Sequence, residues 1–347
     1  MILLTNIGGD WYFQGMENQV YITVRYTLVR ILTITLLFLF VKNDTDVIMY
    51  CFLLVLNFAG SNIFNLLFIF KSISLKAIRF SDLNIRRHFS PVLKVFIAAI
   101  SINIYAQLDN FIIGFLAGDK YLAYYTVPNK LIRYVISFIT VAGIVMLPKI
   151  SRLWQTNKVE YYENLKLAFE IIFLLSVPFM GYFLIFSSFI IHIMAGQDFY
   201  ESITTMRILS PLCVIVGLAY FFGYLLLYTQ KRESVYTISV LISAVLSVFM
   251  NIIMVKYFQQ NGAAVTQVIV ELLAISFMAY KTRSQILKLK LSFKEISKVI
   301  FASSFACFSS ILISKLFHES LIEFAILSVI YFFQIFIILI ICKEKMY

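Results

Sequence analysis

The stretch LAFEIIFLLSVPFMGYFLIFSSFIIHI, residues 167–193, contains one acidic residue, Glu170, and is otherwise almost entirely apolar. A helix of about 20 consecutive apolar residues crosses the hydrocarbon core of a bilayer, so this stretch is long enough to span a membrane. Strands of membrane barrels are about ten residues long and alternate between apolar and polar positions, whereas this run is continuous. The stretch therefore predicts a transmembrane helix.

The rest of the chain repeats this pattern. Further apolar stretches of suitable length lie at residues 21–41, 47–70, 92–117, 122–147, 208–228, 235–255, 262–280, 299–316 and 320–342. The 347 residues are 61% hydrophobic and 14% charged, whereas soluble domains are nearer half apolar and a quarter charged. We therefore expect an all-α, polytopic transmembrane helix bundle of about ten spans.

The positive charges follow these spans. Most of the 29 Lys and Arg residues lie on one set of alternate loops, and each intervening loop carries one. The basic loops lie within residues 71–94, 149–166, 231–232, 281–298 and 343–345. Basic residues near spans stay on the cytoplasmic side, so we expect both termini in the cytoplasm. The net charge of +11 then reflects topology and attraction to anionic lipid headgroups, not a nucleic-acid partner.

Residues 71–90, KSISLKAIRFSDLNIRRHFS, mix basic and apolar residues at roughly helical spacing. This pattern is typical of an amphipathic helix that lies along the membrane surface. The segment separates the second predicted span from the third, and we interpret it as the boundary between two helical bundles.

No sequence pattern typical of catalysis is present. There is no nucleophile elbow, metal-binding His cluster or Gly-rich phosphate loop. The four cysteines are far apart and show no spacing of a zinc site or a disulfide framework. We therefore expect no enzymatic activity, no cofactor and no metal. Gly114 and Gly118 form a small-xxx-small pattern, which predicts close helix packing.

Ionisable residues inside the predicted spans are the best candidates for function. Each costs roughly 2.5–3.5 kcal/mol or more at the bilayer centre, so such residues usually face an interior cavity or one another. They are Arg25, Arg30, Asp109, Lys130, Arg133 and Glu271, with Glu170 at a shallower depth.

Three of these residues are expected at one depth. Asp109 and Lys130 lie equally far from the predicted turn at 118–120, and Arg133 shares a helix face with Lys130. One carboxylate thus meets two cations. An ion pair that holds the hairpin together is one interpretation, and a cationic pathway for an anionic substrate is the other. The additional cation favours the pathway.

The remaining candidates have simpler alternatives. Arg25 and Arg30 have no acidic residue on their own span, and their side chains can extend to the cytoplasmic headgroups, Arg25 more readily because it lies near the end. Glu271, midway along its span, can be a structural partner or a protonatable coupling site. A transporter of an anionic substrate needs such positioned charge and two accessible states rather than bond chemistry.

Residues 107–151, QLDNFIIGFLAGDKYLAYYTVPNKLIRYVISFITVAGIVMLPKIS, resemble the opening hairpin of the second half of polysaccharide flippases. These Wzx-type proteins are the O-antigen or capsule translocases of the multidrug/oligosaccharidyl-lipid/polysaccharide exporter superfamily. The elements that carry the resemblance are Leu108-Asp109, Gly114, Gly118-Asp119, Tyr124-Tyr125, Lys130, Arg133 and Leu147-Pro148-Lys149-Ile150-Ser151. Residues 10–17, followed by Tyr21-Ile22, are similar to the linker after the fourth helix of the first half, and 251–253 with 262–265 are similar to a late turn.

The resemblance implies a MATE-like fold of two six-helix bundles with two further helices. It implies a flippase that moves undecaprenyl-diphosphate-linked oligosaccharide across the bacterial cytoplasmic (inner) membrane, by ion-coupled alternating access, for O-antigen, capsule or exopolysaccharide synthesis. The implied partners are the lipid-linked oligosaccharide, membrane lipids, and the polysaccharide polymerase and chain-length machinery. In this interpretation Arg25, Arg30, Lys130 and Arg133 line a cationic substrate pathway, and Asp109 and Glu271 are charge partners or ion-coupling residues.

The resemblance also implies four helices before residues 10–17. We accordingly expect residues 1–90 to be the remnant of an N-terminal bundle plus the connector, 91–281 the second six-helix bundle, and 282–347 two additional helices. A truncated gene, a misassigned start and a fragment would each account for this.

Two alternative functions differ in their requirements. A related exporter could carry lipid II or a cationic drug, but a drug antiporter should have an excess of intramembrane carboxylates. A polytopic polymerase or acyltransferase would need a large external loop or a catalytic His with a carboxylate, and neither is evident in the sequence.

Overall fold

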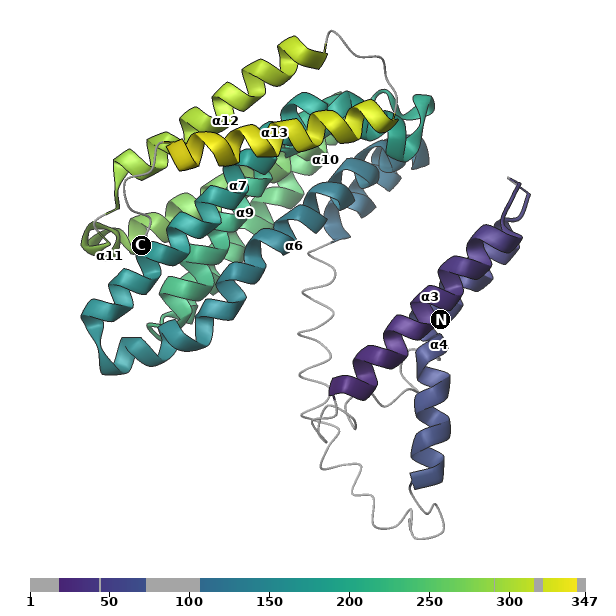
Figure 1. Ribbon diagram of the computed structural model, residues 1–347, viewed down its shortest axis with the longest axis horizontal. Coiled ribbons are helices and arrows are strands. Elements are labelled where there is room, and N and C mark those ends of the chain that lie inside the picture. The colour runs from purple at the N-terminus through teal and green to yellow at the C-terminus, as the bar shows by residue number, and fades with distance from the viewer. Residues whose placement is uncertain (1–18, 44, 73–106, 290, 315–320, 342–347) are drawn as a thin grey trace. The chain divides into compact units, whose positions relative to one another are not determined.

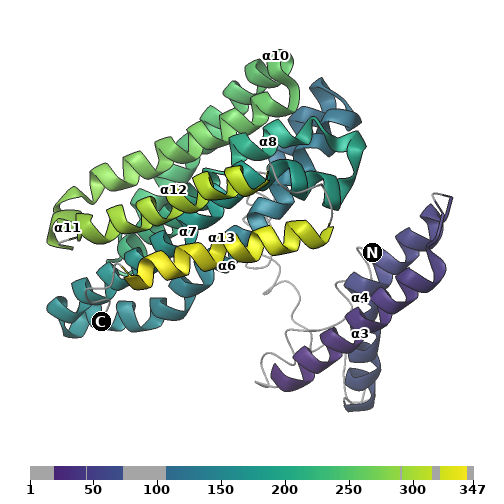
Figure 2. The same cartoon turned by 45° about the horizontal axis from the view of Figure 1, so that its top comes forward.

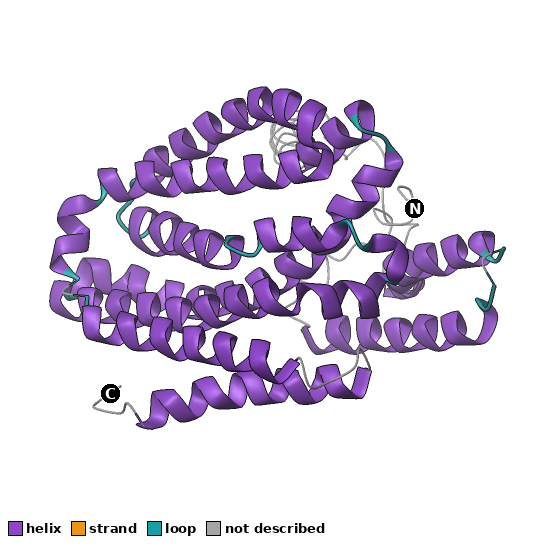
Figure 3. Ribbon diagram, turned by 90° about the horizontal axis from the view of Figure 1, so that it is seen from above, coloured by secondary structure: helices purple, strands orange, loops and turns teal. Residues whose placement is uncertain are grey.

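The computed structural model describes residues 19–43, 45–72, 107–289, 291–314 and 321–341 (Figure 1). Every regular element among these residues is a helix, which confirms the all-α expectation (Figure 3). The chain divides into two compact units, Met1–Phe96 and Ile97–Tyr347. The proposed division at residues 90 and 281 stays a prediction.

The described part of the first unit is a helical hairpin. Helix α3 (Gln19–Phe40) packs along α4 (Val47–Ser72), with Val29 and Leu53 buried in the contact (Figure 1). In the turn between them the carboxylate of Asp46 accepts hydrogen bonds from the backbone N–H groups of Lys42 and Asn43, both at 3.0 Å. These bonds stabilise the ionised carboxylate and lower the pKa of Asp46 below its ordinary value. The two hydrogen bonds thus stabilise the turn that joins α3 to α4.

The second unit is a larger bundle. It begins with helical residues 107–116. The elements that follow are α6 (Asp119–Thr156), α7 (Lys158–Ala195), η3 (Gln197–Phe199), α8 (Ser202–Leu209), α9 (Leu212–Tyr220), the π-helical η4 (Phe221–Tyr228), α10 (Glu233–Lys281), α11 (Arg283–Lys288), α12 (Phe293–Ser314) and α13 (Leu321–Ile341). Helix α7 lies at the centre and contacts α6, α8, α9, α12 and α13 (Figure 2).

Eight of the described helices are long and apolar enough to cross a membrane. One of them, α10, contains a reversal at Gln259 and therefore supplies the two spans expected at 235–255 and 262–280. Each expected span thus has a counterpart except 92–117, which is described only from residue 107. The connector expected at 71–90 lies, beyond residue 72, outside the described residues, as does the motif at 10–17.

The outward faces of the helices are strongly apolar. Phe115 is 88% exposed and Ile48 is 86% exposed, and many other large apolar side chains are uncovered. In water such surfaces would drive association, whereas lipid tails solvate them without cost. The exposure pattern therefore agrees with a chain whose surrounding solvent is the bilayer.

Short turns join the long helices. Gly118 adopts φ 95° between residues 107–116 and α6, a conformation that favours glycine. A Cβ atom on Gly118 would meet nothing within 4 Å, and one on Gly114 would meet Leu122 at an ordinary 3.6 Å. Gly118 therefore belongs to the turn, and Gly114 lies in the helix before it. Neither glycine makes the expected close helix packing. At the other end of α6, Asn157 caps α7 by accepting hydrogen bonds from the N–H groups of Val159 and Glu160.

The reversal within α10 depends on a close backbone approach. Gln259 has φ 46° and ψ −129°, and the chain folds back so that Ser243 in the first arm lies 3.5 Å from the carbonyl of Val270 in the second. A Cβ atom on Gly262 would clash with the backbone carbonyl oxygen of Met254. The two arms can meet at this point only because Gly262 has no side chain.

We expect Gly262→Ala to destabilise the protein by about 1–3 kcal/mol or more, because backbone atoms must move to admit the methyl group. The measurement is the thermal unfolding midpoint of the detergent-solubilised protein. Gly114→Ala is the matched control, and its midpoint should be unchanged or higher because its methyl group fits. Equal midpoints for the two variants would contradict the close approach at Gly262.

Candidate functional site

Charged residues from three segments of the second unit lie close together. Asp109 comes from residues 107–116, Arg133 from α6, and Glu271 from the second arm of α10. Arg133 interacts electrostatically with both carboxyl groups, and the two carboxyl groups also interact with each other. We call Asp109, Arg133 and Glu271 the charged cluster. The expectation that Asp109 and Arg133 are near each other agrees with this arrangement.

The direct partners of Asp109 are uncharged. Its Oδ1 accepts a hydrogen bond of 2.7 Å from Nδ2 of Asn251 and lies 3.5 Å from the hydroxyl of Ser247. Its Oδ2 lies 3.0 Å from the hydroxyl of Tyr125. The carboxyl group is therefore held in the bundle by contacts with three uncharged side chains.

The hydroxyl of Tyr125 connects two oxygens. It lies 3.0 Å from Oδ2 of Asp109 and 2.9 Å from the amide oxygen of Gln267. A phenol has one proton and can donate to only one acceptor, so the other contact requires a donor on the facing group. A proton on Asp109, or the reversed amide of Gln267, would supply it. The buried ring of Tyr125 thus links the carboxyl group to the second arm of α10.

Lys130 and Arg133 are the two predicted pathway cations of the second unit. Both are exposed and lie one turn apart on α6. Among the described residues the ion pairs are Lys166–Glu170 at 3.8 Å and Lys298–Glu295 at 2.9 Å, and neither Lys130 nor Arg133 takes part in them. The ion pair between Asp109 and Lys130 or Arg133, which one interpretation of the sequence required, is not among them.

The other two predicted cations lie in the first unit. Arg25 is 6% exposed, and its guanidinium lies 4.8 Å from the ring of Tyr26 and 5.6 Å from that of Tyr21. Cation–π contacts of this kind hold an arginine within the protein instead of directing it to headgroups. Arg30, by contrast, is exposed on α3. A common pathway for Arg25, Arg30, Lys130 and Arg133 stays a prediction.

Several residues around the charged cluster were missed by the sequence interpretation. Tyr125, Ser247, Asn251 and Gln267 contact Asp109 or one another. One signal was present: Ser239, Ser243, Ser247 and Asn251 recur every fourth residue in an apolar span and are all buried. Polar residues at this spacing share one helix face and indicate a polar contact inside the bundle.

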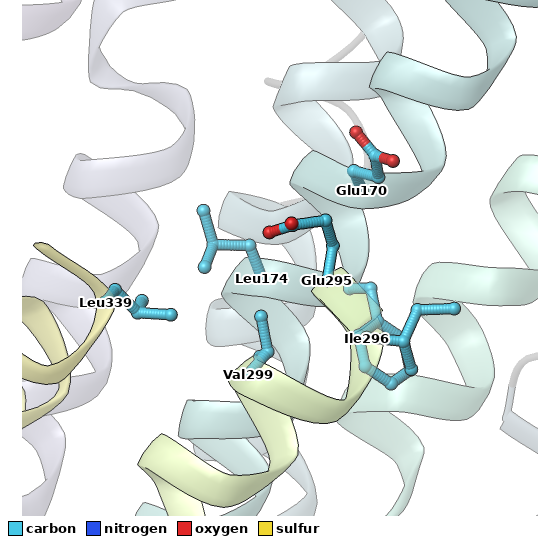
Figure 4. Close-up of a pocket in the computed structure, with 7 residues that line it drawn as sticks. Glu170, Leu174, Glu295, Ile296, Val299 and Leu339 are labelled. Atoms are coloured by element: carbon cyan, nitrogen blue, oxygen red, sulfur yellow. The ribbon is translucent and has the colours of Figure 1, made fainter. Parts of the chain in front are cut away.

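Other cavities and groupings do not extend this site. Within the described part of the chain, no group of three or more His, Cys, Asp and Glu side chains is placed to hold a metal ion. A small cavity of about 20 Å³ lies between α7, α12 and α13, where Glu170 and Glu295 approach Leu174, Val299 and Leu339 (Figure 4). It has room for about one water molecule. Both glutamates are paired with a lysine of their own helix.

Comparisons with known proteins agree with the resemblance inferred from the residues. The family model "Polysaccharide biosynthesis protein" matches residues 7–154. Two curated relatives are both named "Putative O-antigen transporter". The one from Escherichia coli (strain K12) is 23% identical over 274 residues, covering 79% of this chain and 66% of the relative. The one from Shigella dysenteriae is 19% identical over 271 residues, covering 77% of this chain and 67% of the relative.

A solved structure shares the fold. The "Lipid II flippase MurJ, inward closed conformation" superposes with a TM-score of 0.66 at 17% identity, covering 82% of this chain and 60% of that chain. The chain spans about two thirds of the length of its curated relatives. The chain is therefore a multi-pass helical membrane protein that is similar in sequence to these O-antigen transporters and in fold to the lipid II flippase.

Proposed function

We propose that this chain acts in moving a lipid-linked oligosaccharide across the bacterial cytoplasmic membrane. The observation that carries the proposal is the exposure of Lys130 and Arg133 on a membrane-spanning helix. A charged group in contact with lipid tails is costly, so exposed cations at this depth require a water-filled cavity or an anionic partner. Transport of an anion explains both.

The diphosphate of an undecaprenyl-diphosphate-linked sugar suits these cations. Lys130 and Arg133 are three residues apart and can approach one headgroup from the same helix face. Arginine binds phosphate oxygens through two parallel hydrogen bonds, and lysine adds a compact positive charge. The names of the curated relatives, which are O-antigen transporters, support the same class of cargo.

The charged cluster supplies a means of coupling. With Asp109 and Glu271 both ionised, Arg133 interacts with two negative groups and attracts an external anion weakly. When a proton or a bound cation neutralises either carboxyl group, the net charge of the charged cluster becomes more positive. Cargo affinity therefore depends on the state of Asp109 and Glu271, as an ion-coupled transporter requires.

The proposal places both termini in the cytoplasm and treats the chain as a transporter rather than an enzyme. Its substrate and membrane lipids are the primary partners, with the polysaccharide polymerase and chain-length machinery as further ones. Lipid II is the second candidate cargo, because the fold is shared with a lipid II flippase.

Reconstitution of the purified chain in proteoliposomes tests the function. The probe is an undecaprenyl diphosphate that carries a fluorescently labelled disaccharide, and a membrane-impermeant quencher reports the outer leaflet. We expect the probe from the inner leaflet to reach the outer leaflet and be quenched during the assay. Labelled lipid II should exchange between the leaflets more slowly. Exchange at the rate of protein-free vesicles would contradict the proposal, and faster exchange of lipid II would favour the second cargo.

Reporter fusions test the orientation. Green fluorescent protein fused after Gly118 should be dark, because that turn is expected outside the cytoplasm, where the exported reporter does not fold. The same reporter fused after Asn157, at the opposite end of α6, should be fluorescent. The measurement is fluorescence per unit of immunodetected fusion, and the reverse pattern would invert the topology.

A further inference from the structure

A row of tyrosines lies beside the charged cluster. Tyr220, Tyr224 and Tyr228 recur every fourth residue from the end of α9 through η4. The rings of Tyr220 and Tyr224 stack at 4.8 Å, and those of Tyr224 and Tyr228 stack at 5.1 Å. Tyr236, from the start of α10, completes the group at 5.4 Å from Tyr224 and 5.5 Å from Tyr228. We call these residues the tyrosine row.

Two glycines position the ends of the row. A Cβ atom on Gly143 of α6 would lie 2.5 Å from Cε1 of Tyr220, and one on Gly223 would lie 2.7 Å from Cδ2 of Tyr236. Both rings therefore lie directly against the backbone of a neighbouring helix turn. The row is consequently a fixed element of the bundle and not a set of freely rotating side chains.

The row is accessible from outside the unit. Tyr228 is 38% exposed, and Tyr220, Tyr224 and Tyr236 are partly exposed, whereas Phe221 and Leu225 between them are buried. Part of each of the four tyrosines is therefore open to the surroundings of the unit. Neighbouring ring centroids of Tyr220, Tyr224 and Tyr228 are 4.8 and 5.1 Å apart, which is about the width of one sugar ring.

An interfacial aromatic belt does not explain the row. Belt tyrosines lie at the level of the headgroups, near one depth. Tyr220 and Tyr228 are eight residues apart, which is about 12 Å along a helix, so the row continues from the end of the span towards its middle. Moreover, Tyr236 lies within electrostatic range of Glu271, which also interacts with Arg133. The row therefore extends from the turn at 229–232 into the span, and Tyr236 connects it to Glu271 of the charged cluster.

Sugars match this surface chemically. A pyranose ring has hydroxyl groups that donate and accept hydrogen bonds, together with apolar C–H groups that pack on aromatic carbons. Tyrosine presents both a hydroxyl that can donate or accept and an apolar ring. Binding sites for small molecules commonly combine aromatic walls with a few polar groups in this way.

We propose that Tyr220, Tyr224, Tyr228 and Tyr236 bind sugar rings of the cargo while its diphosphate lies at Arg133. This inference rests on the proposed function and deepens it, because it assigns the glycan to one set of side chains. In the proposed orientation Tyr228 lies at the cytoplasmic end of the row.

Binding measurements on the full chain in lipid nanodiscs test the inference. The probes are undecaprenyl diphosphate and the same lipid carrying one N-acetylhexosamine. We expect the wild type to bind the sugar-bearing lipid several-fold more tightly. Tyr224→Phe and Tyr228→Phe each remove one hydroxyl and keep the ring, and each should reduce this preference about two- to tenfold, the size of one hydrogen bond. Affinity for bare undecaprenyl diphosphate should be unchanged.

The control is Tyr280→Phe. Tyr280 is an exposed tyrosine near the C-terminal end of α10, and it lies outside the row. It should retain the full sugar preference. A wild type that binds both lipids equally, or a Tyr280→Phe variant that loses the preference as strongly as Tyr224→Phe, would overturn the tyrosine row as a sugar site. A wild type that binds neither lipid would instead overturn the proposed function.

Discussion

Arg133→Gln is expected to reduce cargo flipping in proteoliposomes about 10- to 100-fold, the range for losing a hydrogen bond to a charged group. The glutamine keeps a polar side chain but removes the positive charge and the paired donors that suit a diphosphate. Lys130→Gln should have a smaller effect, because lysine contributes a point charge without the planar geometry. The same order should hold for surface polysaccharide in cells that depend on this chain.

The matched control for this prediction is Arg152→Gln. Arg152 is also exposed on α6, but it lies near the end of the helix, beyond the charged cluster. Its replacement should leave flipping within twofold of the wild type, and both variants should reach the membrane in normal amounts. If Arg133→Gln flips cargo as fast as Arg152→Gln, Arg133 is not part of an anion pathway.

Asp109→Asn is expected to preserve the amount of folded protein. It should reduce the transport driven by an ion gradient about tenfold or more, the size of losing a charged hydrogen-bonding group. Asparagine has the shape of aspartate, and its amide can still meet Tyr125, Ser247 and Asn251. Its side chain cannot take up a proton or bind a cation through charge. The fold should therefore survive and the coupling should not.

Two measurements separate coupling from a structural role. Fluorescence-detected size exclusion gives the amount of folded protein, and counterflow with and without an imposed ion gradient gives the coupling. Tyr125→Phe is the comparison, because it removes the hydroxyl link between Asp109 and Gln267 and leaves the carboxyl group in place. A low yield of Asp109→Asn with normal gradient-driven transport per folded molecule would show that Asp109 only holds helices together.

The spans were predictable because each one is a local property of the sequence. A run such as 167–193 must be helical in a bilayer, where every backbone polar group needs an internal partner. The reversal in α10 was predictable for the same reason, since 235–255 and 262–280 are separately long enough to cross. The Gly114-xxx-Gly118 pattern misled because a turn glycine and a packing glycine look alike until φ and the neighbouring atoms are known.

The contacts around Asp109 could not be derived from spacing. The charges in the sequence suggested that Asp109 pairs with cations on the next helix. Its shortest hydrogen bond comes instead from Asn251, a neutral residue 142 positions away. The tyrosine row was visible as Tyr220, Tyr224 and Tyr228 at intervals of four, but only the fold adds Tyr236 and brings the row towards Glu271. Such sites depend on helix neighbours that a single sequence does not specify.

The length of α6 and α7 has a mechanical consequence. Each has 38 residues, a contour of about 57 Å, against a hydrocarbon core of about 30 Å. Both helices are therefore longer than one crossing requires, and they join at Asn157. A small tilt of either helix displaces this junction more than it displaces the residues inside the membrane, so a spin label placed there would report changes in the tilt of α6 and α7.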